Sequence, residues 1–319
     1  MSLSSARTFK LALPDLVSNS YFPAIAAVEL GMFKQCGLDV SLEMVYPAPA
    51  CYDALRDCQV DFVAGSAHLP LGAFPGWRGA RLLCSLSQGM YWFLVLRKGL
   101  GATRGDLSIL DGMRIVAAPG VDLGFRALLD AAGIDPVEHN IEIAPLPGGV
   151  AAGVSFGVAA ARAMEAGKID GFWANGMAAA VAVDSGAGDI ILDVRRGDGP
   201  PSAFAFTQPS LACRAELAES DPEIVQAAVG AIMQTQKALR EDPSLATRVG
   251  QAWFPAQEAR LIQGLVERDL DYYHAHIDTA FIDAMQAFAM RIGTLDQALP
   301  ADMIVDRGCR LLWESPQPS

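Results

Sequence analysis

Hydrophobic residues recur along this chain first with the spacing of a helix and then with the alternation of a strand. Residues 22–45 (FPAIAAVELGMFKQCGLDVSLEMV) keep the helical spacing up to Gly37 and alternate after it. Residues 125–146 (FRALLDAAGIDPVEHNIEIAPL) follow the same order around Gly133. Glycine often ends a helix because it adopts the left-handed conformation without strain. Both stretches therefore predict a helix, a terminal glycine and a strand.

Two short phrases of the sequence also resemble each other. ALRDCQVDF (54–62) and AMEAGKIDGF (163–172) each end a helical pattern, pass a polar break, and reach a β-branched residue and Asp before an apolar run. With the apolar segments FKLAL (9–13) and RIVAAP (114–119) ahead of them, the order β-α-β-α-β occurs twice. Alternating β and α units predict a parallel sheet with helices on both faces. The sequence therefore predicts two doubly wound α/β lobes.

Two further strand-like segments are expected to connect these lobes. Residues 85–98 (SLSQGMYWFLVLRK) would leave the first lobe, and residues 202–217 (SAFAFTQPSLACRAEL) would return to it. This double crossover predicts a two-strand hinge and a discontinuous first lobe, 1–90 plus 205–319. Residues 91–204 would form the second lobe, with a ligand cleft between the two.

The chain is expected to be mostly helical from Asp221 to Trp313. Asp221 stands where a helix would be capped, with Pro222 at the first helical position, and Asp242 with Pro243 repeats the arrangement. This C-terminal segment is assigned to the first lobe.

Composition excludes several classes of partner. The 319 residues are 52% hydrophobic with a net charge of -12, and the longest basic run is Arg195-Arg196, so no binding to nucleic acid is expected. The apolar runs are too short to insert into a membrane. The N-terminal segment 1–17 has no small-residue cleavage site, so the chain as written is expected in the cytoplasm, or in the periplasm if an export signal was removed.

The cysteines are scattered without the spacing of a disulfide framework or a metal site. We expect buried thiols in a reducing compartment, no metal and no cofactor. The six positions are Cys36, Cys51, Cys58, Cys84, Cys213 and Cys309.

Five segments, in the same order, resemble the solute-binding proteins of ABC importers. They are residues 26–42, 54–66, 110–135, 163–175 and 221–239. The resemblance is to the branch that handles taurine, alkanesulfonates, nitrate and the pyrimidine precursors of thiamine, which also contains hydroxymethylpyrimidine-phosphate synthase. It implies a type II periplasmic-binding-protein-like fold, a monomer that works with an ABC permease, and a repeat that reflects two similar lobes facing a cleft.

The ligand site is expected beyond the carboxyl ends of the strands, where five loops would meet. These loops are residues 14–22, 46–51, 65–70, 119–125 and 172–177, with Tyr91 and Trp92 at the hinge. The candidate ligand-binding residues are Asp15, Asn19, Tyr21, Tyr46, Ser66, His68, Trp92, Asp122, Trp173 and Asn175.

The chemistry of these loops favours one class of ligand. They contain no Lys or Arg, so a sulfonate or nitrate would depend on backbone N–H groups while Asp15 and Asp122 oppose it. Carboxylates and amides beside aromatic rings suit a flat nitrogen heterocycle, neutral or cationic, resembling the thiamine pyrimidine precursors. The same residues also have structural interpretations: the two aspartates could cap helices, and Trp92 and Trp173 could belong to the lobe cores.

The alternative function is an intracellular enzyme on the same scaffold. Cys51 lies where a helix should begin, a position that lowers the pKa of a thiol, and His68 lies one loop away, so the two could form a nucleophile-base pair. The scaffold resembles that of a desulfinase and a dihydroxyphthalate decarboxylase. Residues 171–181 (GFWANGMAAAV) replace the cysteine-rich cluster of the pyrimidine synthase, which argues against that activity.

Overall fold

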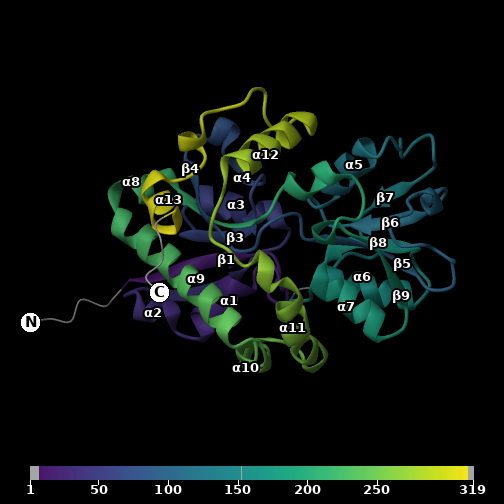
Figure 1. Ribbon diagram of the computed structural model, residues 1–319, viewed down its shortest axis with the longest axis horizontal. Helices are drawn as coiled ribbons and strands as arrows, with labels where there is room; N and C mark the ends of the chain where they lie inside the picture. Colours follow the sequence, from purple (N-terminus) through teal and green to yellow (C-terminus); the bar gives the residue numbers. More distant parts are fainter. Residues whose placement is uncertain (1–6, 152, 315–319) are drawn as a thin grey trace, which may run out of the picture.

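Two five-stranded sheets form the framework of the computed structural model, which describes residues 7–151 and 153–314 (Figure 1). The first sheet has the order β2-β1-β3-β10-β4, and the second has the order β7-β6-β8-β5-β9. The strands of the first sheet are β1 (Thr8–Leu13), β2 (Asp39–Met44), β3 (Phe62–Ser66), β4 (Ala80–Ser85) and β10 (Pro209–Arg214). Those of the second are β5 (Trp92–Arg97), β6 (Arg114–Ala117), β7 (Glu142–Ala144), β8 (Gly171–Asn175) and β9 (Gly188–Asp193). Residues 1–6 of the N-terminal segment considered for export lie outside the described residues.

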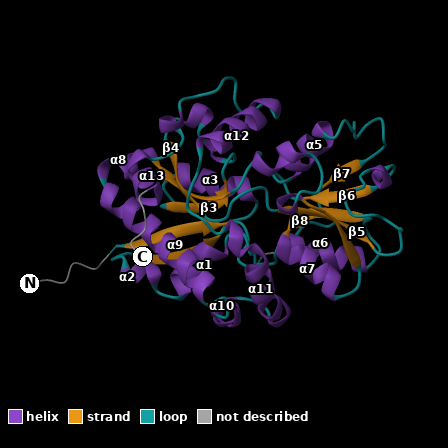
Figure 2. Cartoon of the chain, viewed as in Figure 1, coloured by secondary structure: helices purple, strands orange, loops and turns teal. Residues whose placement is uncertain are grey.

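Helices cover both faces of each sheet, so the prediction of two doubly wound α/β lobes is confirmed (Figure 2). Lobe 1, on the first sheet, contains α1 (Phe22–Glu29), α2 (Met32–Gln35), α3 (Ala48–Arg56) and α4 (Pro70–Ala73). Lobe 2, on the second sheet, contains α5 (Asp122–Ala131), α6 (Phe156–Glu165) and α7 (Gly176–Asp184). The C-terminal helices are α8 (Ala215–Ser220), α9 (Pro222–Glu241), α10 (Leu245–Trp253), α11 (Ala256–Asp269), α12 (Thr279–Arg291) and α13 (Arg307–Glu314). Short 3-10 turns are η1 (Pro75–Trp77), η2 (Ser108–Leu110), η3 (Val194–Arg196), η4 (Pro201–Ala205), η5 (Leu270–Tyr272) and η6 (Ala301–Met303).

The three strands of each predicted β-α-β-α-β repeat are parallel, as expected, and one further strand in each sheet runs against its neighbours. In the first sheet β1 pairs in parallel with β2 and β3, whereas β10 is antiparallel to β3 and β4. In the second, β6 pairs in parallel with β7 and β8, whereas β5 is antiparallel to β8 and β9. The reversed strands, β5 and β10, are the ones that arrive from the other lobe. Each starts at the edge where the parallel strands end, and it must therefore run in the opposite direction.

The repeated phrase of the sequence marks equivalent positions in the two sheets. The Asp61 carboxylate accepts a hydrogen bond from the Lys10 backbone N–H (2.9 Å), while the Asp61 N–H donates to the Lys10 carbonyl (2.9 Å). Asp170 makes the same pair of bonds with the backbone of Arg114 (3.1 and 3.2 Å). In each lobe this aspartate therefore ties the start of the central strand, β3 or β8, to the start of its neighbour, β1 or β6.

The two crossings between the lobes run beside each other. The strand in the outgoing crossing is shorter than predicted, because β4 ends at Ser85 and β5 begins only at Trp92. The returning crossing contains η3 and η4 before β10. Backbone hydrogen bonds join the crossings: Leu86 N–H donates to the Pro209 carbonyl (2.8 Å), and Met90 N–H donates to the Phe204 carbonyl (2.8 Å).

The C-terminal segment is mostly helical, as predicted, although the starts of two helices, α9 and α10, differ from the prediction. Asp221 precedes α9, but its carboxylate accepts from the Ser220 hydroxyl (2.7 Å) and makes no capping bond to the helix. Helix α10 begins at Leu245 because the Asp242 carboxylate accepts from the Ser244 N–H (3.0 Å) and forms a turn there. None of the helices in the described part of the chain is long and apolar enough to cross a lipid bilayer.

Helix α11 lies at the junction of the lobes (Figure 1). It packs against α7 of lobe 2, and Arg260 of α11 forms an ion pair with Asp184 at the end of α7 (2.5 Å). Because α11 contacts both lobes, the assignment of residues 205–319 to lobe 1 stays a prediction.

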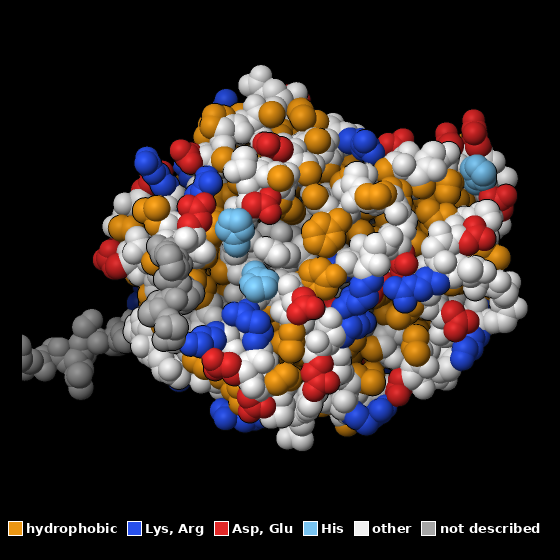
Figure 3. Space-filling model, viewed as in Figure 1, with side chains coloured by type: hydrophobic (Ala, Val, Ile, Leu, Met, Phe, Trp, Pro, Cys, Tyr) orange, Lys and Arg blue, Asp and Glu red, His pale blue; other side chains and the backbone are white. Residues whose placement is uncertain are grey.

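Acidic and basic side chains are interspersed over the face of the molecule drawn in Figure 3.

Candidate functional site

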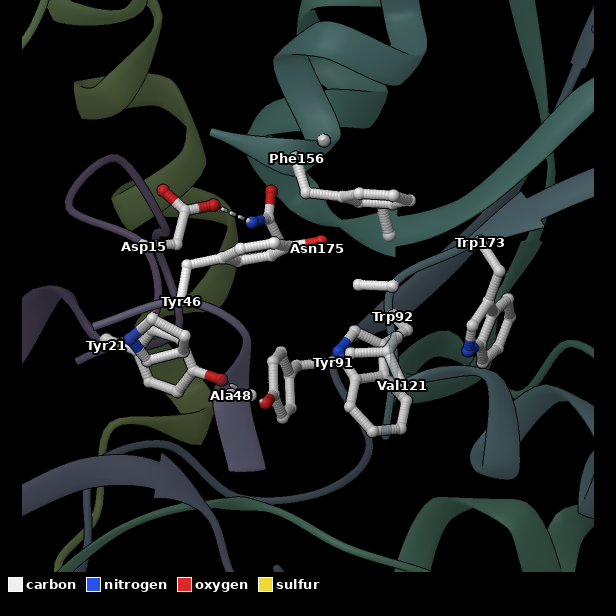
Figure 4. A pocket seen from close by; sticks show the side chains of 14 residues that line it. Asp15, Tyr21, Tyr46, Ala48, Tyr91, Trp92, Val121, Phe156, Trp173 and Asn175 are labelled. Carbon is white, nitrogen blue, oxygen red and sulfur yellow. Dashed lines mark hydrogen bonds between the residues drawn. The ribbon is translucent and has the colours of Figure 1, made fainter. Parts of the chain in front are cut away.

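A small cavity of about 50 Å³ lies between the two lobes (Figure 4). Its walls come from lobe 1, from the outgoing crossing and from lobe 2, so no single lobe could form it. The lining residues are Pro14, Asp15, Tyr21, Tyr46, Ala48, Tyr91, Trp92, Ala118, Val121, Phe156, Gly157, Trp173, Ala174 and Asn175. This volume has room for only a few water molecules, which indicates that the lobes are closed against each other.

Aromatic rings form most of the wall of the cavity. Tyr46 and Phe156 face each other from opposite lobes in Figure 4, with Trp92 and Trp173 to one side. The ring centroids of Trp92 and Trp173 are 6.2 Å apart, and Trp173 stacks on Phe125 at 5.2 Å. Trp92 and Trp173 therefore belong both to the core and to the cavity wall. A wall of this kind suits a flat, apolar-faced ligand.

A buried carboxylate joins the lobes at one end of the cavity. Asp15, in the loop after β1, accepts from the Ser155 hydroxyl (2.7 Å) and from the Asn175 side-chain amide (2.8 Å), both in lobe 2. Its other oxygen accepts from the Val17 N–H (2.9 Å). Burial raises the pKa of Asp15, while these three hydrogen bonds oppose the shift. Asn175 in turn caps α7, because its side-chain oxygen accepts from the Ala178 N–H (3.1 Å).

A chain of hydroxyl groups forms another polar part of the wall. The hydroxyls of Tyr21 and Tyr91 are 2.5 Å apart, and the Tyr91 hydroxyl lies 2.7 Å from Ser66 Oγ. Burial raises the pKa of Tyr91 to about 12, so this hydroxyl stays protonated at neutral pH. Each hydroxyl can donate or accept, and the chain can therefore adapt to a neutral ligand of either polarity.

Three arginines lie near the junction, but all of them bind one aspartate. Asp269, at the end of α11, is fully buried and forms ion pairs with Arg195 (3.1 Å), Arg196 (2.9 Å) and Arg268 (3.1 Å). The Asn19 side-chain amide also donates to it (2.6 Å). Burial alone would raise the pKa of Asp269, but the arginine charges and their hydrogen bonds outweigh it and leave the pKa lowered. No Lys or Arg is among the described residues that line the cavity.

The structure brings together six of the ten predicted ligand-binding residues. Those that line the cavity are Asp15, Tyr21, Tyr46, Trp92, Trp173 and Asn175. The other four are near it but do not line it. Ser66 lies behind Tyr91, and Asn19 binds Asp269. His68 binds Thr207, and Asp122 accepts from the Gly120 N–H (3.0 Å) and pairs with Arg126. That any of the ten binds a ligand stays a prediction.

The environment of Cys51 contradicts the expectation of a thiol with a lowered pKa. Cys51 lies inside α3 and its thiol donates to the Val45 carbonyl (3.1 Å), and burial raises its pKa to about 12. His68 is also buried, which lowers its pKa to about 3, and its Nδ1 lies 2.9 Å from the Thr207 hydroxyl. The thiol and the imidazole are thus each bound to other partners. In the described chain, no group of three or more His, Cys, Asp or Glu side chains could hold a metal ion.

Several lining residues are not among the ten candidate ligand-binding residues, although Pro14, Ala48, Val121 and Ala174 lie in the expected loops. Phe156 follows the glycine-rich stretch 148–153, whose sequence gives no sign that the next residue faces a cleft. Tyr91 is expected only at the hinge from the sequence, because alternation along a strand does not show which face meets the second lobe. The remaining ones are small or apolar: Pro14, Ala48, Ala118, Val121, Gly157 and Ala174.

No protein-family model and no curated protein sequence matches this chain. Solved structures do match it. The alkanesulfonate-binding protein SsuA from Xanthomonas axonopodis pv. citri, with MOPS bound, superimposes with a TM-score of 0.70 at 15% identity, over 94% of this chain and 99% of its own. The ligand-binding component of an ABC-type import system from Staphylococcus aureus, with zinc bound, gives a TM-score of 0.70 at 13% identity, over 96% and 99%.

A cysteine-to-serine variant of DszB in complex with biphenyl-2-sulfinic acid is also similar, with a TM-score of 0.64 at 16% identity, over 95% of this chain and 98% of its own. Likeness at these identities shows a shared fold, the two-lobed fold of periplasmic binding proteins. The expected fold class is therefore confirmed.

Proposed function

We propose that this chain is a solute-binding protein that closes its two lobes on a small organic ligand. The observation that carries the proposal is the cavity walled from both lobes, with Asp15 of lobe 1 bonded directly to Ser155 and Asn175 of lobe 2. A ligand that touches both walls binds the closed form better than the open one, and it therefore shifts the population toward closure. The two crossings would absorb the rotation.

The ligand class that fits this cavity is a neutral or cationic nitrogen heterocycle, comparable to the thiamine pyrimidine precursors. An anion would face the Asp15 carboxylate with no cation among the described lining residues to balance it. The arginines at the junction are already paired with Asp269. Aromatic faces and a carboxylate instead suit a ring that carries N–H groups. We therefore expect a ligand different in class from that of the alkanesulfonate-binding structural neighbour.

Closure on a ligand becomes useful when a partner distinguishes the closed form, and the partner we propose is an ABC permease. The fold it shares with the ligand-binding component of an ABC-type import system supports this role. The alternative function, an enzyme that uses Cys51 and His68, gains no support from the bonds that these two side chains make.

A thermal-shift screen tests the proposal. Aminopyrimidines, purines, alkanesulfonates, nitrate and aromatic acids are each added to the purified protein, and every stabilising compound is quantified afterwards by chromatography. A ligand at 100 times its dissociation constant adds about 2.7 kcal/mol to the free energy of unfolding, a shift of several degrees in Tm.

A heterocycle that stabilises the protein and is recovered unchanged is the expected result. Stabilisation by a sulfonate or nitrate with no response to any heterocycle would contradict the ligand class. A stabilising compound that is consumed would contradict a pure binding role.

A further inference from the structure

Two tryptophans in the described chain are fully buried with an indole N–H that has no hydrogen-bond partner, Trp77 and Trp173. They differ in surroundings. Trp77 lies in a hydrophobic cluster of lobe 1 formed with β3, α3 and α12. Trp173 instead lines the cavity between the lobes, and in Figure 4 the ring edge that carries its nitrogen is turned toward Trp92 and Val121.

A buried N–H without an acceptor is costly, because the group lost its water on folding and gained nothing in return. Most buried polar groups in proteins are therefore paired, and an unpaired one in a cavity wall calls for an explanation. At Trp173 the indole N–H supplies a fixed donor beside aromatic faces. An acceptor atom in the plane of a ligand ring would remove this cost.

The opposite side of the cavity offers an acceptor. In Figure 4, Asp15 and Trp173 lie on opposite sides of the rings of Tyr46 and Trp92. Asp15 already accepts three hydrogen bonds, from Val17, Ser155 and Asn175. A carboxylate has about four acceptor sites, so one remains for a donor on the ligand.

We propose that Trp173 is a specificity-determining residue, whose indole N–H binds an acceptor atom on one edge of a planar ligand while Asp15 binds an N–H donor on another edge. This inference rests on the proposed function and narrows its ligand class. A ring with both a donor and an acceptor fills both polar sites, whereas a ring with the donor alone leaves the indole N–H unpaired.

Isothermal titration calorimetry with two probes and two variants tests this assignment. The probes are 4-aminopyrimidine, which carries an amine and ring-nitrogen acceptors, and aniline, which carries the amine on a ring without them. Trp173→Phe keeps an aromatic ring at the cavity wall and removes the N–H. Trp77→Phe is the matched control, because it removes the other unpaired indole N–H away from the cavity.

Loss of one net hydrogen bond corresponds to a weakening of roughly 2- to 12-fold. We expect Trp173→Phe to weaken 4-aminopyrimidine by that factor relative to aniline, and Trp77→Phe to leave the ratio of the two affinities at the wild-type value. The ratio is measured within each variant, so a general loss of stability does not alter it.

Equal weakening of both probes by Trp173→Phe would overturn the inference and leave the proposed function standing, because only the bulk of the ring would then matter. If neither probe binds the wild-type protein while an alkanesulfonate does, the proposed ligand class falls, and this inference falls with it.

Discussion

The side-chain amide of Asn175 donates to the carboxylate of Asp15 at 2.8 Å, and this bond joins lobe 2 to lobe 1 across the cavity wall. Asn175 also caps α7, so its position is fixed by the helix it begins. Asp15 is buried and, among the described residues, has only uncharged donors as hydrogen-bond partners. The contact that closes the lobes therefore contains a carboxylate, and burial makes its charged form less stable than it would be in water.

The first prediction concerns the pH dependence that this carboxylate creates. Burial raises the pKa of Asp15 above its ordinary value of 3.8. Between that value and the raised one, the folded protein binds more protons than the unfolded chain, so Asp15 makes the free energy of unfolding fall as pH rises through this window. Asp15→Asn removes the titration. We expect chemical denaturation between pH 4 and pH 7 to show that, at the lower end of the range, the free energy of unfolding of the variant falls less with rising pH, or rises more, than that of the wild-type protein.

Parallel profiles for the wild-type protein and Asp15→Asn would contradict a raised pKa at Asp15. A steeper fall in the variant than in the wild-type protein would mean that the pKa of Asp15 is lowered in the folded state.

The second prediction concerns the close approach of α7 to lobe 1. A Cβ atom at Gly176 would lie 2.6 Å from Arg268 Nη2 and 2.8 Å from Asn19 Oδ1, and both side chains are held by Asp269. Gly176→Ala therefore forces the lobes apart at this point, at a cost of about 1–3 kcal/mol for overpacking. We expect weaker binding of any ligand that requires closure and a larger radius of gyration by small-angle X-ray scattering.

A matched control for this change lies in α11. A Cβ atom added at Gly264 would have no atom of the described chain within 4 Å beyond its own stretch of helix. Gly264→Ala should therefore raise helix stability by about 0.5–1 kcal/mol and leave binding unchanged. Wild-type affinity and dimensions in Gly176→Ala would show that the lobes do not need this contact to close.

The third prediction concerns the ion cluster around Asp269. Arg195 is buried against the outgoing crossing, where its side chain also donates to the Gln88 carbonyl (2.8 Å). Asp269→Asn leaves that charge buried without its counter-ion, and removal of one partner of a buried pair costs about 3–5 kcal/mol. Urea denaturation should show this loss. The exposed pair of Lys237 with Glu241 is the control, and Glu241→Gln should cause no measurable change. Equal stability of Asp269→Asn and the wild-type protein would refute the cluster's role.

The fold could be predicted because its signals are local. Helical spacing, glycine at helix ends and strand alternation each depend on neighbouring residues, and the repeated Asp61 and Asp170 mark the same strand junction in both lobes. The direction of β5 and β10 is not among these local signals, because the crossing between the lobes sets it. Local pattern carries no information on that direction.

The site could be predicted only because the topology of a parallel sheet places the loops that follow its strands at one edge. This rule predicted that Asp15 and Asn175, which are 160 residues apart in the sequence, would lie in the same site. It could not show that Asn19 turns away to Asp269, 250 residues later, or that His68 turns to Thr207. Side-chain direction depends on such distant partners, which no single stretch of sequence reveals.

The fourth prediction separates the binding function from the enzyme alternative by the reactivity of the cysteines. Cys58 is exposed and Cys36 partly so, whereas the other four thiols are buried, and burial raises the pKa of Cys51 to about 12. Because the thiolate is the reactive form, iodoacetamide should label native protein first at Cys58 and leave Cys51 unmodified until the chain unfolds. Peptide mass spectrometry over a time course measures the order, with urea-unfolded protein as the reference for full labelling.

Cys51→Ser should then bind ligands like the wild-type protein. Labelling of Cys51 as fast as Cys58 in native protein would show an activated thiol in α3, and the enzyme alternative would replace the binding function as the better explanation of this fold.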